Sequence, residues 1–575
     1  MAFLDVENSL SGRFWQGPTD AELRMGAAIA QAHGLNEMLA RILARRGITP
    51  ETAREFLDPT LRDLMPDPSS LMDMDAATAR LITALERGER IAIFADYDVD
   101  GAGSAALLIL WLRHFGVEPT LYIPDRIDEG YGPNIPAMER LGAAHDLIIC
   151  VDCGTVAHEP IAAAGCDVIV LDHHQGAETL PPAVATVNPN RQDEESPLTY
   201  LCAAGVVFLL LVAANRGLRG KRDLPDLMAM LDIVALATVA DVAPLLGLNR
   251  ALVRQGLTVM ARRQRPGLVA LSDVARLDRA PEAFHLGFLL GPRINAGGRV
   301  GRADLGTRLL TAQTHEEAIG LATQLDDLNK ERRAIEAQVL DDAIAQAEAR
   351  GDAALVWAAG ENWHPGVVGI VASRLKERMH RPAVVIGFVD GEGKGSGRSV
   401  AGVDLGTAIS KLMHEGLIER GGGHKMAAGL SLTEPQLEPA MARLTALIDA
   451  QDGATGPEPL RIDGVIAAAA ATPDLIEDMA KAGPYGAAAS APRVALSGAR
   501  IAFTRPVGDG HLQVTFNDGT GKLDAIAFRV MDTPLGEALV NHDGAAFHVA
   551  GRLEIDTWQG RMKVKLRIED AAPVR

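Results

Sequence analysis

From residue 90 onward, short apolar runs alternate with longer stretches in which apolar and polar positions follow a helical period. The stretches 103–116 (GSAALLILWLRHFG) and 158–165 (HEPIAAAG) are of the helical kind. This alternation is typical of a parallel sheet with helices on both faces. It predicts an α/β domain whose strands include 90–95 (RIAIFA), 119–124 (PTLYIP), 146–152 (DLIICVD) and 167–172 (DVIVLD).

The pattern changes several times along the rest of the chain, which predicts a multidomain α/β protein. Residues 314–351 lack proline and contain one internal glycine, so they predict one or two long helices, about 50 Å long if continuous. After the linker 452–459 (DGATGPEP), short alternating strands indicate a small β-barrel of the oligonucleotide-binding type, the OB-fold. The predicted parts are an N-terminal helical region (1–75), a larger parallel-sheet domain with a helical extension (76–310), a connecting helix (311–350), a smaller α/β domain (351–453) and the barrel (460–575).

Composition narrows the class of protein. Of 575 residues, 47% are hydrophobic, which is enough for several cores, yet no run approaches the roughly 18 apolar residues of a membrane span. The first ten residues lack the basic region and apolar core of a signal peptide. Four cysteines make no disulfide framework, and for Cys150 and Cys153 we expect a buried structural role because no second pair completes a zinc site. We therefore expect a cytoplasmic protein.

The charge balance is acidic, with 56 Lys and Arg against 75 Asp and Glu and a net charge of −19. This balance argues against loose, non-specific coating of nucleic acid. It leaves open a nucleic-acid enzyme whose basic residues are gathered in one groove. Carboxylates that surround metal ions would also add to the acidic count.

Carboxylates and imidazoles gather where the predicted strands of the larger domain end. Alternate residues of an extended segment point the same way, so the three acids of the segment DYDVDG should converge. We interpret the apolar stretch 232–245, which contains a further acid, as a fourth strand end of the same kind. Because parallel strands share one polarity, we expect these ends to meet at one edge of the sheet. The residues concerned are Asp96, Asp98, Asp100, Asp152, Asp172, His173, His174 and Asp241.

Such a cluster suits divalent cations, since the carboxylates would otherwise repel one another. A set rich in aspartate with about one histidine for two metals favours two Mn²⁺ ions, with Mg²⁺ as the alternative. Asp152 is central enough to bridge two ions, and two metals can activate a water and stabilise a leaving oxygen. A single aspartate at a strand end is more often a helix cap or turn residue, and for Asp172 we favour a role in orienting the neighbouring histidines.

Nine segments carry a family resemblance. DYDVDG, VDCG, DHH and ADVAPL resemble, in this order, the four motifs of the DHH phosphoesterase superfamily. The segments PDRIDEGYG, GPRINAGGR, HPGVVGIVASRL, GSGRS and GGGHKMAAG resemble, more narrowly, the RecJ exonuclease family and its DHHA1-type second domain. Together they span most of residues 90–430, and the barrel stands where that family has an OB-fold. The resemblance implies a metal-dependent exonuclease that hydrolyses single-stranded DNA from 5′ to 3′ in repair and recombination.

The resemblance also assigns the metal ligands. Asp98 would bind one metal and Asp100 the other, while Asp152 would bridge them. His173 would ligate a metal, and Asp241 would complete the second site.

Two positions qualify this assignment. Many members of the superfamily have a histidine four residues before the position of Asp98, where this chain has Phe94. Asp96 is our candidate to replace that ligand. The resemblance further implies that His174 contacts the substrate phosphate and that Asp172 holds the histidine pair.

Recognition of a 5′-phosphate calls for arginines and for amide or hydroxyl donors. By resemblance, Arg126, Ser396 and Arg398 would hold this phosphate, joined by either Arg299 or Arg293. The alternatives are a surface salt bridge between Arg126 and Asp128 or Glu129, and a flexible turn in the glycine-rich loop 393–399 (GKGSGRS), whose backbone amides could otherwise approach an anion.

Further candidates for DNA contact lie in the smaller domain and the barrel. His424 follows a glycine run that lines the nucleic-acid path in DHHA1-type domains, and the alternative is a helix start after a tight turn. Trp363 could stack on a base or be buried. In the barrel, alternation places four basic residues on one face of a strand, and aromatic residues there are more often core than stacking platforms. These barrel residues are Phe516, Phe528, Trp558, Arg561, Lys563, Lys565 and Arg567.

Other functions use the same motifs. A DHH-family phosphodiesterase of short oligonucleotides or cyclic dinucleotides, or an inorganic pyrophosphatase, would bind the same metals. A non-catalytic scaffold is disfavoured because clustered carboxylates without a function are costly. The chain length, the connecting helix and the barrel favour a polymer substrate, and the resemblance implies that this polymer is single-stranded DNA, preferably with a 5′-phosphate. We expect a monomer without membrane contact, and the resemblance implies a helicase and a single-strand-binding protein as partners.

Overall fold

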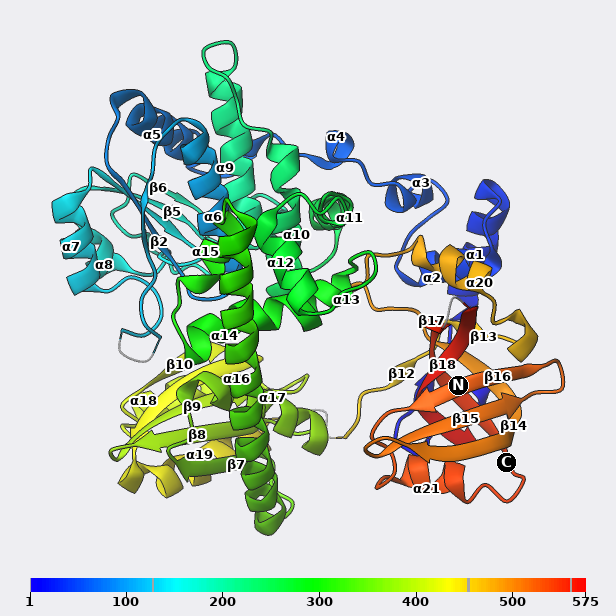
Figure 1. The fold of residues 1–575 in the computed structure, drawn as a ribbon. Coiled ribbons are helices and arrows are strands. Elements are labelled where there is room, and N and C mark those ends of the chain that lie inside the picture. The colour runs from blue at the N-terminus through cyan, green and yellow to red at the C-terminus, as the bar shows by residue number, and fades with distance from the viewer. Residues whose placement is uncertain (1, 127–128, 452–455, 559–560, 575) are drawn as a thin grey trace. The chain divides into compact units, whose positions relative to one another are not determined.

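The structure is a computed structural model that describes residues 2–126, 129–451, 456–558 and 561–574. The chain divides into two compact units (Figure 1). One combines Met1–Asp63 with Gly456–Arg575, and the other is Leu64–Thr455. Among the described residues, no helix combines the length and the apolar character that crossing a bilayer requires.

The larger unit contains a five-stranded parallel sheet, as the alternating pattern predicts. Its order is β3-β2-β4-β5-β6. The central strands β2 and β4 are buried throughout, because helices cover both faces of the sheet (Figure 1). The strands are β2 (Ile91–Ala95), β3 (Thr120–Tyr122), β4 (Leu147–Val151), β5 (Asp167–Leu171) and β6 (Ala185–Val187).

The other regular elements of this part of the chain are helices. Their apolar faces pack on the sheet and on one another, and a continuous helical run from Ala283 to Val300 includes one π-helical turn. The helices are α5 (Met74–Arg87), α6 (Val99–His114), α7 (Ile135–Ala144), α8 (His158–Ala162), α9 (Ala203–Leu218), α10 (Leu231–Ala240), α11 (Gly247–Ala261), α12 (Pro266–Val274), α13 (Ala283–His285), the π-helix η4 (Leu286–Leu290), α14 (Gly291–Val300) and α15 (Leu305–Thr311).

The long connecting helix is one element, α16 (His315–Arg350), of 36 residues. At 1.5 Å per residue it is about 54 Å long. Thr314 caps its start by accepting a hydrogen bond from the Glu317 amide. The helix contacts α12 and α14 of the parallel-sheet domain and α17 and β7 of the smaller domain, so it joins both cores within this unit.

The smaller domain has a mixed sheet of order β10-β11-β9-β8-β7, in which only β7 and β8 pair in parallel. Its helices cover both faces of this sheet and enclose two apolar clusters. The elements are β7 (Val356–Glu361), α17 (Pro365–Met379), β8 (Ala383–Val389), β9 (Glu392–Arg398), α18 (Leu405–His414), β10 (Arg420–His424), β11 (Ala427–Thr433) and α19 (Leu437–Asp449).

Two glycine-rich segments differ from their predicted form. The segment 393–399 is not a loop, because residues up to Arg398 form β9 and pair with β8 and β11 on both sides. Its glycines are needed for packing, since a Cβ at Gly395 would lie 2.8 Å from Ile386 and one at Gly397 2.6 Å from Leu405. The segment 420–429 does not start a helix either, and forms the hairpin of β10 and β11.

The other unit is built on the predicted barrel. Five long strands form a closed sheet, because β14 pairs with β17 as well as with β15. The elements are β13 (Gly464–Val465), α20 (Pro473–Ala480), β14 (Val494–Val507), β15 (His511–Asn517), β16 (Lys522–Ala527), α21 (Pro534–Val540), β17 (Ala546–Trp558) and β18 (Arg561–Pro573).

Residues 1–63 belong to the same unit as the barrel and share its core. β1 (Trp15–Gln16) pairs in parallel with β12 (Leu460–Arg461). The fully buried Trp15 donates a hydrogen bond from Nε1 to Asp570 Oδ2 at 2.8 Å. The helices α1 (Asp20–His33) and α2 (Glu37–Arg45) contribute apolar residues to the barrel's main cluster, and α3 (Ala53–Leu57) and α4 (Leu61–Leu64) follow them.

Candidate active site

Three of the predicted acids follow strands of the parallel sheet directly. Asp96 follows β2, Asp152 follows β4 and Asp172 follows β5. Since these strands are adjacent and parallel, the three carboxylates lie at one edge of the sheet, as predicted. All three side chains are buried.

Asp98 and Asp100 reach this edge by a different route from the predicted extended segment. Asp98 is the N-cap of α6, and its Oδ1 accepts hydrogen bonds from the amides of Asp100 (2.8 Å) and Gly101 (3.1 Å). Asp100 therefore lies in the first helical turn, where it accepts hydrogen bonds from Ala203 and Ala204 at the start of α9. The turn requires Gly101, because a Cβ there would lie 2.3 Å from the carbonyl oxygen of Asp96.

The interpretation of 232–245 as a strand end is wrong. This segment contains α10, and Asp241 is its C-cap. An apolar stretch without polar alternation is compatible with a buried helix as well as with a strand, and its length of ten residues is the feature that favours a helix. The helix nevertheless carries Asp241 to the same cluster, with Oδ2 lying 3.9 Å from His173 Nδ1.

His173 lies at the centre of the cluster. Its Nε2 is 3.2 Å from Asp152 Oδ1 and 3.7 Å from Asp100 Oδ2. Ligand atoms within 4.8 Å of one another form three groups that share these residues. The groups are Asp152, His173 and His174; Asp100, His173 and Asp241; and Asp96, Asp98 and Asp152. The structure thus brings together all six predicted metal ligands, Asp96 included, while Phe94 is buried in the sheet.

The electrostatics of these residues fit divalent cations. Oδ1 of Asp96 and Oδ1 of Asp152 are buried and have no hydrogen-bond partner among the described residues. Burial and the neighbouring carboxylates raise the pKa of both groups well above its usual range. Burial, followed by the charges of Asp100 and Asp98, raises the pKa of Asp241 to about 9. Bound cations would supply the positive charge that these carboxylates lack.

Asp172 holds the two histidines in place. Its Oδ1 accepts hydrogen bonds from the amides of His173 (2.7 Å) and His174 (3.1 Å) and from His174 Nδ1 (2.8 Å). Its Oδ2 accepts one from the Thr155 amide. Although burial alone would raise it, the contact with His174 lowers the pKa of Asp172 below its usual range. The same contact raises the pKa of His174 despite burial, which favours an imidazolium.

Several residues around the histidines are not indicated by the sequence patterns above. The Tyr131 hydroxyl lies 3.1 Å from His174 Nδ1 and 3.0 Å from the carbonyl oxygen of Asp152. Asn188 and Asn190 donate side-chain hydrogen bonds to the carbonyl oxygens of His174 and His173. The segment NPN that follows β6 is a signal of the same strand-end kind, and Tyr131 belongs to the motif PDRIDEGYG.

The predicted phosphate contacts also converge. Arg126, Arg299 and Arg398 line one polar cavity of about 440 Å³, together with residues of α17. Burial and the charge of Arg126 lower the pKa of Arg299 to about 10 and also lower the pKa of Arg398. Ser396 Oγ accepts a hydrogen bond from Arg398 Nη1 at 2.8 Å. Guanidinium groups that repel one another in this way form a site for an anion.

The sequence leaves open whether Arg299 or Arg293 contacts the terminal phosphate, and the two residues have different surroundings in the structure. Arg299 lines the cavity and donates a hydrogen bond to the carbonyl oxygen of Gly366. Arg293 instead forms an ion pair with Asp326 on α16 at 2.9 Å. Arg126 stacks on Tyr97, with its guanidinium carbon 5.0 Å from the ring centre. Of the suggested partners of Arg126, Asp128 lies outside the described residues.

Other candidate DNA contacts are placed in different ways. His424 is exposed and lies two strands from Arg398, since Ala427 pairs with both. Trp363 is buried in the core cluster formed by α16, α17, β7 and β8, which agrees with the buried alternative and not with stacking on a base.

In the barrel, Phe516 is fully buried, so a stacking role for it is wrong. Phe528 is 43% exposed, and the guanidinium of Arg567 lies 5.1 Å from its ring centre. Lys565 and Arg567 form ion pairs with Asp556 and Glu554 respectively, while Lys563 is exposed. The side chains of Trp558 and Arg561 lie outside the described residues.

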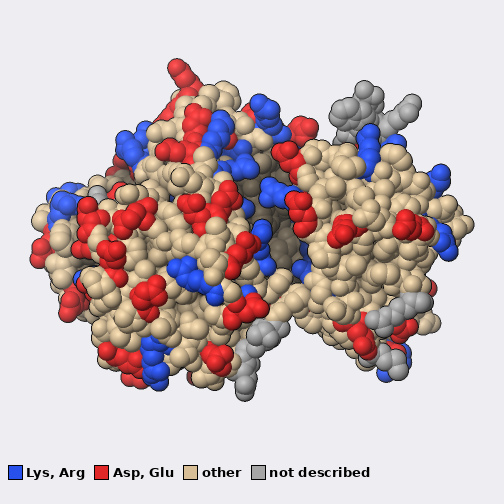
Figure 2. Space-filling view, turned by 90° about the horizontal axis from the view of Figure 1, so that it is seen from below, with Lys and Arg blue, Asp and Glu red and all other residues tan. Residues whose placement is uncertain are grey.

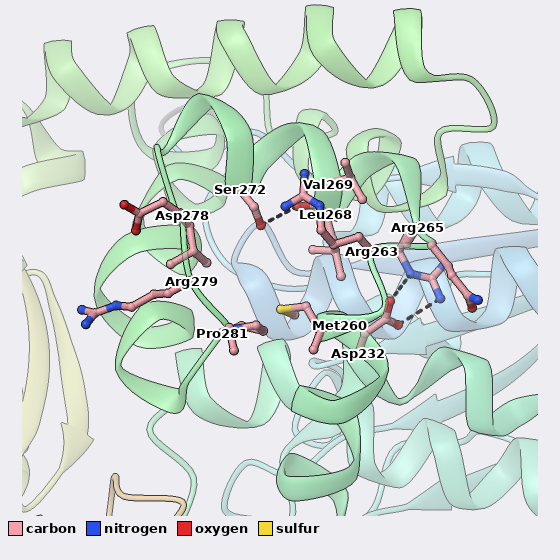
Figure 3. Close-up of a pocket in the computed structure, with 14 residues that line it drawn as sticks. Asp232, Met260, Arg263, Arg265, Leu268, Val269, Ser272, Asp278, Arg279 and Pro281 are labelled. Carbon is pink, nitrogen blue, oxygen red and sulfur yellow. Dashed lines mark hydrogen bonds and ion pairs between the residues drawn. The ribbon is translucent and has the colours of Figure 1, made fainter. Parts of the chain in front are cut away.

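A second cavity, of about 430 Å³, lies among α10, α11 and α12 (Figure 3). Its Arg265 donates hydrogen bonds to both carboxylate oxygens of Asp232, and Arg263 forms an ion pair with Asp273. Asp232 is nine residues from Asp241 on α10, which corresponds to about 13 Å along the helix. These paired charges distinguish this cavity from the arginine-lined one.

Acidic side chains are spread over the face of the protein drawn in Figure 2, as the net charge of −19 implies. A polyanion would therefore be attracted only where positive charge is concentrated. The arginine-lined cavity is such a place.

Comparisons with known proteins agree with this arrangement. Residues 90–238 match the DHH family, N-terminal domain, 351–450 match the DHHA1 domain, and 462–570 match the RecJ OB domain. The chain is 38% identical over 569 residues to the single-stranded-DNA-specific exonuclease RecJ of Dickeya dadantii, covering 94% of this chain and 96% of that protein.

Solved structures show the same similarity. The crystal structure of RecJ in complex with Mn²⁺ from Thermus thermophilus superposes with a TM-score of 0.82 and 30% identity, covering 97% of this chain and 79% of that one. The structure of RecJ in complex with Mg²⁺ from the same organism gives a TM-score of 0.76 at 28% identity, with 97% and 78% covered.

Proposed function

The chain belongs to the RecJ family of single-stranded-DNA-specific exonucleases, and from this premise we propose that it degrades single-stranded DNA from the 5′ end. The observation that carries the proposal is the pairing of two sites in one unit. A cluster of carboxylates and imidazoles suited to two cations lies in the same unit as a cavity lined by four arginines, of which Arg374 is paired with Glu336.

The carboxylates and His173 hold the metal ions in this proposal. Asp96 and Asp98 would hold one ion, Asp100 and Asp241 would hold the other, and Asp152 would serve both, with His173 as the imidazole ligand. Two Mn²⁺ ions, or Mg²⁺ ions in their place, would supply Lewis-acid chemistry there, which would activate a water and stabilise the leaving oxygen of a phosphodiester hydrolysis. The family neighbours with Mn²⁺ and Mg²⁺ support this choice of metals.

His174 contacts the scissile phosphate. The contact with Asp172 raises the pKa of His174 and so favours the imidazolium, which donates a charge-assisted hydrogen bond to a phosphate oxygen. Asp172 fixes the orientation of the ring through Nδ1, and the Tyr131 hydroxyl lies against the same nitrogen.

The arginine-lined cavity binds the terminal phosphate and so sets the polarity of the enzyme. Arg126, Arg299 and Arg398 supply the charge, and Ser396 orients Arg398. His424 contacts the strand farther from its end. The barrel extends the grip through Phe528 and Arg567, because aromatic rings beside basic residues bind single strands with little sequence preference.

The same premise supports a biological setting. An enzyme of this kind acts in DNA repair and recombination in the cytoplasm. A helicase would supply its single strands and a single-strand-binding protein would cover them, while the enzyme itself acts as a monomer. A phosphodiesterase of short oligonucleotides would not need the barrel, and the match of residues 462–570 to the RecJ OB domain disfavours that alternative.

The test is digestion of end-labelled DNA. Single strands carrying a 5′-phosphate should be degraded progressively from that end in Mn²⁺ and more slowly or equally in Mg²⁺. A 3′-labelled strand should shorten gradually, whereas a 5′-labelled strand should release its label in the first products.

Three controls define the outcome. Blunt duplex DNA of the same sequence should persist, and strands with a 5′-hydroxyl should be degraded less efficiently. Gradual shortening of the 5′-labelled strand would show the opposite polarity. Hydrolysis of cyclic dinucleotides in preference to long strands would support the alternative enzyme class.

A further inference from the structure

Two phenylalanine rings stand exposed on a helical run that packs against α10, the helix whose C-cap is Asp241. Phe284 is 53% exposed and Phe288 is 74% exposed. Their ring centres are 5.0 Å apart at an interplanar angle of 24°, so the two rings stack on each other. Burying such rings in a core is worth roughly 1.5–3 kcal/mol each, and their exposure therefore calls for another explanation.

The backbone that carries these rings is rigidly held. Phe288 lies in the π-helical turn η4, and Leu286 and Leu290 of the same turn are fully buried. Gly287 approaches the end of α10 closely, since a Cβ there would lie 3.4 Å from Val239, two residues before Asp241. Single π-helical turns of this kind are frequent at functional sites.

The helical run from 283 to 300 passes the three parts of the site in order. The phenylalanine pair lies at its start, on the turn whose Gly287 packs against Val239 near the end of α10. Farther along, Asn295 Oδ1 accepts a hydrogen bond from the Val99 amide, between Asp98 and Asp100. Arg299 lies at the end and lines the phosphate cavity. From Phe288 to Arg299 the helix rises about 16 Å, which is long enough to follow several nucleotides of a single strand.

We propose that Phe284 and Phe288 form a stacking platform for bases of the single strand on the 3′ side of the bond that is cut. This inference rests on the proposed function. If the 5′-phosphate occupies the arginine cavity and the metals bind the scissile phosphate, the next part of the strand continues toward the other end of the same helical run. Phe288 offers the more exposed ring to a base, and Phe284 supports it from behind.

The platform gives a reason why the enzyme retains a strand between cuts. Stacking on an aromatic ring accepts every base, since every base has a π-face. It requires unpaired bases, so it also favours single strands over duplex DNA. Each successive cut would move the strand one step along the run without releasing it.

The test uses the metal-loaded enzyme and strands with a single abasic residue at successive positions from the 5′-phosphate. In the wild type, KM should rise roughly 5- to 150-fold when the abasic residue occupies the stacking position, the range expected for one stacked base. Phe288→Ala should raise KM for the intact strand by a similar factor and should lose the sensitivity to that position. The turnover number should change little.

Matched variants separate stacking from a general effect. Phe288→Trp should retain the wild-type profile, and Phe288→Leu should resemble the alanine variant. Ile319→Ala, which changes a partly exposed apolar residue on α16, should leave the profile unchanged. Alanine is the residue most compatible with a helix, so the alanine variants should fold.

Two kinds of failure remain distinguishable. If the wild type does not degrade single strands, the proposed function itself is wrong. If it degrades them and Phe284→Ala/Phe288→Ala shows the wild-type KM and abasic profile, the platform is wrong, and a protein partner becomes the alternative occupant of these rings.

Discussion

Asp241→Asn should stabilise the metal-free protein while it abolishes hydrolysis. The folded structure raises the pKa of Asp241 from 3.8 to about 9. A carboxyl with a higher pKa in the folded than in the unfolded state binds its proton more tightly when folded. Its contribution to stability is therefore complete below about pH 4 and is lost as the pH rises toward 9. Asparagine removes this titration and keeps the shape of the side chain.

The size of the effect follows from the same shift. At pH 7 the pH lies about three units above the pKa of the carboxyl in the unfolded chain. Each unit adds 1.36 kcal/mol to the free energy needed to protonate the group. Folding thus carries a cost of at most about 4 kcal/mol at this site. Because the Asp241 side chain is 22% exposed, part of the cost is relieved by water, and we expect a gain of roughly 2–4 kcal/mol in the variant.

Asp232→Asn on the same helix is the matched control with the opposite sign. Asp232 is buried and accepts two hydrogen bonds from Arg265, at 2.9 and 3.0 Å (Figure 3). Removing its charge leaves the partly buried guanidinium without a counter-ion, which should cost somewhat less than the about 3–5 kcal/mol of a fully buried pair. Asp241→Asn should therefore stabilise the metal-free protein and Asp232→Asn should destabilise it, although both substitutions replace an aspartate by an asparagine.

Hydrogen exchange is the appropriate assay, because a protein of two units does not unfold in a single step. Protection of peptides from β2 and β4 in EDTA reports the unit that contains Asp241. The difference between Asp241→Asn and wild type should shrink between pH 7 and pH 5. In saturating Mn²⁺ the order should reverse, since metal stabilises only the protein that binds it. Lower protection of metal-free Asp241→Asn at pH 7 would refute the reasoning.

Three further predictions concern catalysis and grip. Asp152→Ala should abolish hydrolysis with the fold retained, because a bridging ligand serves both ions; turnover near the wild-type rate by a folded variant would exclude the two-metal assignment. Arg398→Ala should weaken binding of 5′-phosphorylated strands by about 1.5–3 kcal/mol and spare 5′-hydroxyl strands; equal losses on both would argue against end recognition. Phe528→Ala should weaken capture of long strands by about 1–3 kcal/mol, measured by KM, with no change on strands too short to reach the barrel.

The strand ends of the site are predictable from sequence because two simple regularities act together. Apolar runs of four to six residues form the parallel strands, and a shared polarity brings Asp96, Asp152 and Asp172 to one edge. The positions of these three acids depend on the strands alone and not on distant packing. Arg126 lies four residues after the end of β3, so its position depends on the intervening loop as well.

The structures around Asp241 and in the glycine-rich segments could not be predicted from the sequence in this way. An apolar stretch that is buried on all sides has no period, so α10 cannot be distinguished from a strand by pattern alone. The glycines of β9 resemble those of a phosphate-binding loop, but they are required by Ile386 and Leu405, residues that pack against them from elsewhere in the fold. The sequence shows which positions are glycine, but it does not show which residues of the folded protein pack against them.

The packing of the N-terminal helices against the barrel cannot be predicted from sequence patterns for a similar reason. Leu39 and Leu43 of α2 look like the apolar face of any helix, and their partners Val514 and Leu566 are more than 450 residues away. Removing residues 460–575 would therefore expose this face as well as delete the barrel. A loss of activity in such a truncation would not distinguish a lost DNA contact from a damaged fold. The substitution of Phe528, an exposed side chain outside this core, tests the barrel's role without that ambiguity.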